Sequence, residues 1–88
     1  MKFTPNVKVR REKRGCVVFD TLREKVFVTN ETGARIVAGI EAGLTPEALV
    51  AQLSAEYDQP AEVIEAEVRQ FIESLRSNGI ALTEETQR

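Results

Sequence analysis

The sequence has 88 residues, a mass of 9.8 kDa and a formal net charge of −2, values that suit one small domain. Apolar residues make up 42% of the chain and charged residues 30%, which is the balance of a globular protein. One cysteine and no histidine exclude an internal disulfide, a conventional zinc site and catalysis by a histidine base. The start of the chain lacks the apolar segment of a secretory signal. We therefore expect a cytoplasmic protein with no cofactor, no metal, no membrane segment and no enzymatic activity.

Charge is distributed unevenly along the chain. Residues 1–35 carry nine basic and four acidic side chains, whereas residues 36–88 carry three basic and ten acidic ones. The basic excess lies mostly in Lys8, Arg10, Arg11, Lys13 and Arg14. Such a cluster either keeps a strand and its turn solvated or attracts an acidic partner, and the sequence leaves both possibilities open.

The first third of the chain predicts three β-strands. Valines alternate with basic residues over residues 7–10, which gives one apolar and one polar face. Residues 16–19 form a short Cys-Val-Val-Phe run, a polar turn follows at 20–24, and a third strand covers 25–29. Short runs of this kind, separated by a few polar residues, indicate an antiparallel meander.

After this third strand the apolar spacing changes to that of helices. Thr29 or Asn30 can cap the first helix, and Gly43 is a natural stop. Thr45 and Pro46 have the residue types expected at the cap and first position of a second helix.

A third helix, predicted to begin at Pro60, has the clearest periodicity of the chain. Its apolar residues recur at i, i+4, i+7 and i+11, namely Ile64, Val68, Phe71 and Leu75. Gly79 follows as a C-terminal stop that would bring Ile80 against Leu75.

The predicted order is three strands followed by three helices, an α+β fold within a single domain spanning residues 1–88, with 83–88 as a frayed tail. Three strands cannot bury a face alone, so we expect the helices to cover one side of the sheet. The expected core consists of Val18, Val26, Val28, Ile36, Val37, Ile40, Leu49, Leu53, Ile64, Val68, Phe71 and Leu75.

Several stretches at consistent spacing carry a family resemblance. They are residues 7–12, Gly15-Cys16-Val17-Val18-Phe19-Asp20, residues 28–37 with Asn30-Glu31-Thr32-Gly33, residues 43–49, residues 63–75 and Asn78-Gly79-Ile80. Together they resemble the PqqD-like family, named after protein D of pyrroloquinoline quinone biosynthesis. These are recognition elements for the precursors of ribosomally synthesised and post-translationally modified peptides (RiPPs).

The resemblance implies a winged-helix-turn-helix-like fold and a peptide-chaperone function. A protein of this family binds the leader segment of a ribosomally made precursor and presents it to a modifying enzyme, often a radical S-adenosylmethionine (radical SAM) enzyme. The leader lies as an added strand beside the third strand, in a groove walled by the third helix.

The third strand itself suits such an addition, because it contains no proline or glycine and has one charge, at its start. On the third helix, Glu65 and Ile72 fall on one flank of the apolar stripe, and Val63, Glu67 and Ser74 fall on the other. Periodicity does not decide which flank borders the groove. The candidate peptide-binding residues are Lys25, Val26, Phe27, Val28, Thr29, Glu65, Val68, Arg69 and Ile72.

Two alternatives remain. The third strand could pair within a homodimer or be covered by the chain's own termini, so both a monomer and a homodimer are open. A DNA-binding winged helix is the second alternative, but the third helix carries four glutamates, at 62, 65, 67 and 73, against Arg69 and Arg76. This acidic helix disfavours a nucleic-acid partner, because DNA binding needs a basic surface.

Overall fold

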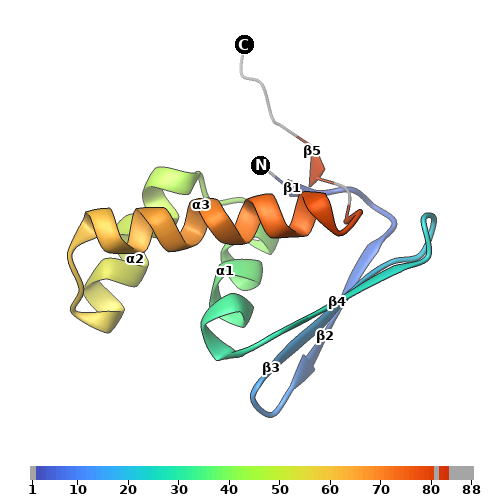
Figure 1. Cartoon of the computed structure of the whole chain (residues 1–88), viewed down its shortest axis with the longest axis horizontal. Helices are drawn as coiled ribbons and strands as arrows, with labels where there is room; N and C mark the ends of the chain where they lie inside the picture. Colours follow the sequence, from blue (N-terminus) through green and yellow to red (C-terminus); the bar gives the residue numbers. More distant parts are fainter. Residues whose placement is uncertain (1, 81, 84–88) are drawn as a thin grey trace.

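The computed structural model describes residues 2–80 and 82–83, in which three helices lie beside an antiparallel sheet (Figure 1). The elements in chain order are β1 (Lys2–Phe3), β2 (Val7–Glu12), β3 (Gly15–Asp20), β4 (Lys25–Thr29), α1 (Glu31–Glu41), α2 (Pro46–Tyr57), α3 (Ala61–Ser77) and β5 (Leu82–Thr83). The predicted α+β fold, with three main strands followed by three helices, is confirmed. In the described part of the chain, none of the helices has the length and apolar character needed to cross a membrane.

The main sheet has the strand order β2-β3-β4, so β3 is central and β4 is an edge strand. Val9 lies opposite Val18, and Val18 lies opposite Phe27, which makes one row across the three strands. Val18 is fully buried and the other two are half-buried against the core. This row faces the helices, so the neighbouring positions of each strand face the other way.

The prediction that Val26 and Val28 belong to the core is wrong. Their exposed fractions are 58% and 70%, whereas Phe27 between them packs against the core. Alternation along a strand forces this outcome, because Phe27 and its two neighbours cannot share a face. All three residues are apolar, so the pattern of β4 does not reveal which face is inward.

The helix ends follow the local signals of the sequence. The side chain of Asn30 accepts a hydrogen bond of 2.9 Å from the backbone N–H of Gly33, and that of Thr45 accepts one of 3.1 Å from Ala48. At the end of α3, the N–H of Ile80 donates to the carbonyl oxygen of Leu75 at 3.0 Å, which is the predicted Schellman contact. Asn30 is therefore the first cap, and Thr29 ends β4 instead.

The two-residue strands β1 and β5 pair with each other and bring the first and last described segments together. Lys2 lies opposite Thr83 and Phe3 lies opposite Leu82. Thr83 therefore belongs to a strand, which corrects the prediction of a frayed tail from that residue on. Residues 84–88 lie outside the described residues.

The core lies between the sheet and the helices. Its buried apolar residues are Cys16, Val18, Ile36, Val37, Ile40, Leu49, Leu53, Ile64, Val68, Ile72, Leu75 and Ile80. On α3, Ile72 is buried and Phe71 is half-buried, which reverses the predicted roles of these two. The reason is that α3 packs against α2 as well as α1, so its buried face turns toward Ile72.

Candidate functional site

The outer edge of β4 has no strand partner within the described part of the chain. β4 pairs with β3 on one side only, from Lys25 opposite Asp20 to Thr29 opposite Cys16. The strand contains no proline, glycine or bulge that would blunt the edge. Its free N–H and C=O groups can therefore accept an extended chain.

An aromatic contact joins this edge to α3. Phe27 points from β4 toward the helices, and its ring centroid lies 5.7 Å from that of Phe71, with the ring planes at 74°. This edge-to-face geometry is a favourable arrangement for two aromatic rings. Phe71 therefore marks the flank of α3 that faces the open strand.

Gly33, in the first turn of α1, makes room for that contact. A Cβ atom at this position would lie 2.7 Å from Cε1 of Phe71 and 2.7 Å from Cβ of Thr29. Only a residue without a side chain lets the strand end, α1 and α3 approach this closely. The Asn30 cap fixes the same turn, so the start of α1 positions both walls of the site.

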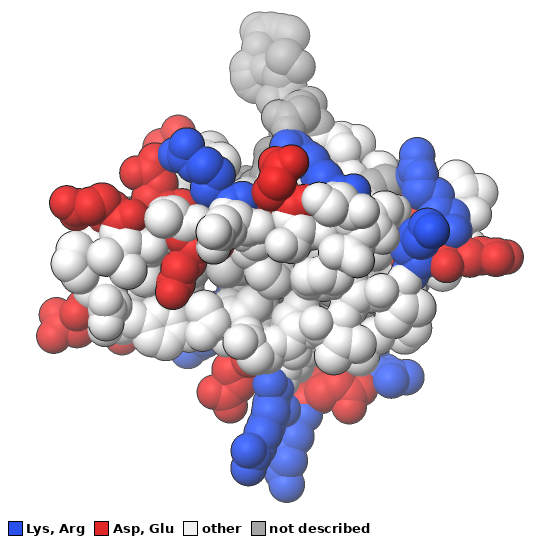
Figure 2. All heavy atoms as spheres, viewed as in Figure 1, with Lys and Arg blue, Asp and Glu red and all other residues white. Residues whose placement is uncertain are grey.

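At the other end of β4, the strand approaches the end of α3. A Cβ atom on Gly79 would lie 2.9 Å from Cγ of Lys25, so the stem of Lys25 packs beside Gly79. Figure 1 shows the C-terminal end of α3 reaching toward the sheet. In Figure 2, which looks onto the same side of the molecule, the centre is largely free of charge and the charged groups lie around its border. This side thus offers backbone hydrogen bonds beside an uncharged surface.

The structure does not bring all the predicted site residues together. Lys25, Val26 and Val28 are exposed on β4, and Phe27 and Thr29 are half-buried toward α3 and α1. Val68 is buried, with 2% of its surface exposed, and belongs to the core.

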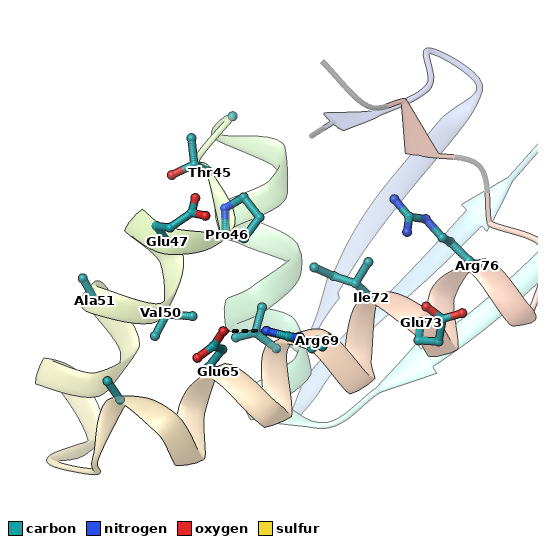
Figure 3. Close-up of a pocket in the computed structure, with 13 residues that line it drawn as sticks. Thr45, Pro46, Glu47, Val50, Ala51, Glu65, Arg69, Ile72, Glu73 and Arg76 are labelled. Atoms are coloured by element: carbon teal, nitrogen blue, oxygen red, sulfur yellow. Dashed lines mark hydrogen bonds and ion pairs between the residues drawn. The ribbon is translucent and has the colours of Figure 1, made fainter. Parts of the chain in front are cut away.

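Glu65, Arg69 and Ile72 lie on the opposite flank of α3, toward α2. They line a hollow of about 860 Å³ with Pro46 and Val50 of α2 (Figure 3). Glu65 and Arg69 form an exposed ion pair across one helical turn. These three residues therefore face α2, and the flank toward β4 carries Phe71 with Glu67 and Ser74 beside it.

Phe71 contacts the open strand through Phe27, and the sequence interpretation did not include it among the candidate peptide-binding residues. Its helical spacing assigned it to the core, and no local signal distinguishes a core phenylalanine from one at the border of a site. The described residues contain no group of three or more histidine, cysteine, aspartate or glutamate side chains placed to hold a metal ion. What they offer at β4 is a strand edge beside a pair of aromatic rings.

An open edge strand beside a helical wall is an architecture that binds extended peptides by strand addition. Residues 15–81 match the family described as Coenzyme PQQ synthesis protein D (PqqD), and the chain belongs to this family. A comparison with curated proteins gives no match.

Two solved structures have the same fold over nearly the whole chain. One is TbiB1 in complex with the TbiA(beta) leader peptide, with 26% identity, a TM-score of 0.80, and coverage of 93% of this chain and 100% of that one. The other is lasso peptide synthetase B1 complexed with the leader peptide, with 27% identity, a TM-score of 0.80, and coverage of 93% and 96%.

Proposed function

We propose that this protein binds the leader segment of a ribosomally made precursor peptide and presents it to a modifying enzyme, such as a radical SAM enzyme. The protein itself supplies recognition and no catalysis, and it acts in the cytoplasm, where such precursors are made. The observation that carries this proposal is the unpaired β4 edge beside Phe71, in a fold whose matched structures are leader-peptide complexes.

Strand addition to β4 explains how one small domain can hold a long flexible segment. Backbone hydrogen bonds to Lys25–Thr29 supply affinity that depends little on peptide sequence. Alternate side chains of the added strand point inward, toward Phe27 and Phe71, and supply selectivity. An extended peptide loses conformational freedom on binding, which lowers its affinity, so the backbone hydrogen bonds and side-chain contacts must offset this loss. We expect a dissociation constant on the order of micromolar or tighter.

For the helical wall we propose Phe71, with Glu67 and Ser74 on the same flank. Val68 supports this wall from the core. The hollow beside α2 is lined instead by Glu65, Arg69 and Ile72. A peptide bound in that hollow would change the NMR signals of these three residues.

A titration followed by NMR tests the proposal. Isotope-labelled protein is titrated with synthetic leader peptides of candidate precursors encoded near its gene. Amide shifts should saturate and concentrate at Lys25–Thr29 and around Glu67, Phe71 and Ser74. Shifts centred on Glu65, Arg69 and Val50 would move the site to the hollow between α2 and α3. No saturable shift at all would contradict peptide binding.

A further inference from the structure

The face of the sheet that points away from the helices carries an apolar surface that the fold does not use. In the strand register, Phe19 lies opposite Val26 and Val17 lies opposite Val28, so these four side chains form two adjacent rows. Val26 and Val28 are 58% and 70% exposed, and the two β3 residues are half-buried. Together we call these four residues the outer patch.

This outer patch is separate from the wall of the peptide site. Phe27 points toward Phe71, and therefore its neighbours Val26 and Val28 point to the other side of β4. On this exposed face the valines gain little burial, and threonine, a polar β-branched residue, would suit the strand as well. Exposed apolar side chains gathered on one face are typical of an interaction surface.

Basic residues of β2 border the outer patch on one side. Lys8 lies opposite Phe19 and Arg10 lies opposite Val17, so both belong to the same face. The guanidinium of Arg10 sits 5.6 Å from the centroid of the Phe19 ring, and its Nε is 2.7 Å from a carboxylate oxygen of Glu12. The surface that complements this face is apolar at its centre and has carboxylates placed against Lys8 and Arg10.

A peptide strand added to β4 would continue the same face. Its outward side chains would stand next to Val26 and Val28, because neighbouring strands share their pleat. The outer patch therefore becomes larger when the leader is bound, and a protein that docks on it would contact carrier and leader together.

We propose that the outer patch, extended by the outward side chains of the bound leader, is the surface on which the modifying enzyme docks. The enzyme contributes an apolar surface with carboxylates facing Lys8 and Arg10. This inference rests on the proposed function, since it requires a leader strand on β4. On this proposal the enzyme distinguishes the leader-bound protein from the free protein, because the leader enlarges the face on which the enzyme docks.

The test uses the full chain, the leader peptide that it binds in the titration above, and a purified candidate modifying enzyme encoded near its gene. The double variant Val17→Thr/Phe19→Thr places β-branched threonine, which suits a strand, at both β3 positions while removing half of the outer patch. We expect leader affinity to stay within about twofold, because neither residue belongs to the peptide site. The affinity of the leader-bound variant for the enzyme should fall about tenfold, because apolar residues at the centre of an interface supply much of the binding energy. Lys8→Glu, a surface change with little risk to folding, should weaken docking in the same direction.

Val50→Thr in the hollow between α2 and α3 is the matched control and should leave enzyme affinity unchanged. Unchanged docking in both Val17→Thr/Phe19→Thr and Lys8→Glu overturns the inference, as does a loss confined to Val50→Thr. A wild-type dimer that dissociates on the same outer-patch substitutions also overturns it, because a second copy then covers the face. If the wild-type chain does not bind the leader, the proposed function is wrong as well. If it binds the leader but the outer-patch variants dock on the enzyme as well as the wild type does, only the further inference is wrong.

Discussion

Gly33 illustrates how a single residue sets the geometry of the site. Alanine is the better helix former by about 1 kcal/mol, so propensity alone favours replacing this glycine. Packing opposes that replacement, because a Cβ atom would come within 2.7 Å of Thr29 Cβ, an atom attached directly to the backbone of β4. Gly39, later in α1, differs in that its closest neighbour is Cδ1 at the end of the Leu49 side chain.

We expect Gly33→Ala to lower the free energy of unfolding by about 2 kcal/mol, the size of an overpacking effect. Gly39→Ala should cost less than half as much, because the end of a leucine side chain can rotate away more easily than a strand backbone. Urea unfolding of both variants, followed by circular dichroism, measures the difference. The reverse order of the two losses would show that the approach of α1 to β4 is not the tighter one.

At the scale of elements, the two flanks of α3 contact different parts of the fold. One flank packs toward α2 and forms the hollow with Val50, and the other meets β4 through Phe71. Ser74 follows Phe71 by three residues and lies on the β4 side, whereas Ser77 points away from both. Both serines are exposed, which makes them a matched pair for distinguishing the flanks.

Ser74→Trp should weaken leader binding about tenfold, because the indole would occupy the space between α3 and an added strand. Ser77→Trp makes the same chemical change away from the groove and should leave the affinity within about twofold. Isothermal titration with the leader peptide provides the measurement. Equal affinities for the two variants would mean that the peptide does not run along this flank.

At the scale of the whole molecule, the short strands β1 and β5 join the first and last described segments. Phe3 of β1 lies opposite Leu82 of β5, and both pack against the edge of the core. Ion pairs between Arg11 and Glu41, at 3.1 Å, and between Arg35 and Glu56, at 3.0 Å, also join elements, but their charged groups are exposed. Exposed pairs contribute about 0–1 kcal/mol, so apolar burial at the chain ends stabilises the fold more than these pairs do.

Phe3→Ala should therefore lower the free energy of unfolding by about 2 kcal/mol, less than the roughly 3–5 kcal/mol typical of a fully buried phenylalanine. Lys2→Ala on the exposed side of the same strand should change it by less than about 0.5 kcal/mol. Thermal unfolding of both variants gives the comparison. A negligible effect of Phe3→Ala would show that β1 and β5 do not contribute to the stability of the fold.

Local signals in the sequence were sufficient for the three main strands, the three helices and the helix caps. The Asn30 and Thr45 caps and the Gly79 stop involve hydrogen bonds between residues no more than five positions apart, so neighbouring residues decide them. The pairing of β1 with β5 was missed for the opposite reason, since Phe3 and Leu82 meet only after the whole chain has folded.

The amino-acid order alone thus established the three strands, the three helices and the absence of blunting residues on β4. Which face of β4 turns inward depended on packing, because Val26, Phe27 and Val28 are all apolar and only the contact with Phe71 separates them. Which flank of α3 faces β4 was likewise decided in three dimensions, where Ile72 is buried beside α2 and Phe71 contacts Phe27 of β4. Periodicity describes one element at a time, whereas a binding surface is formed by two elements that meet.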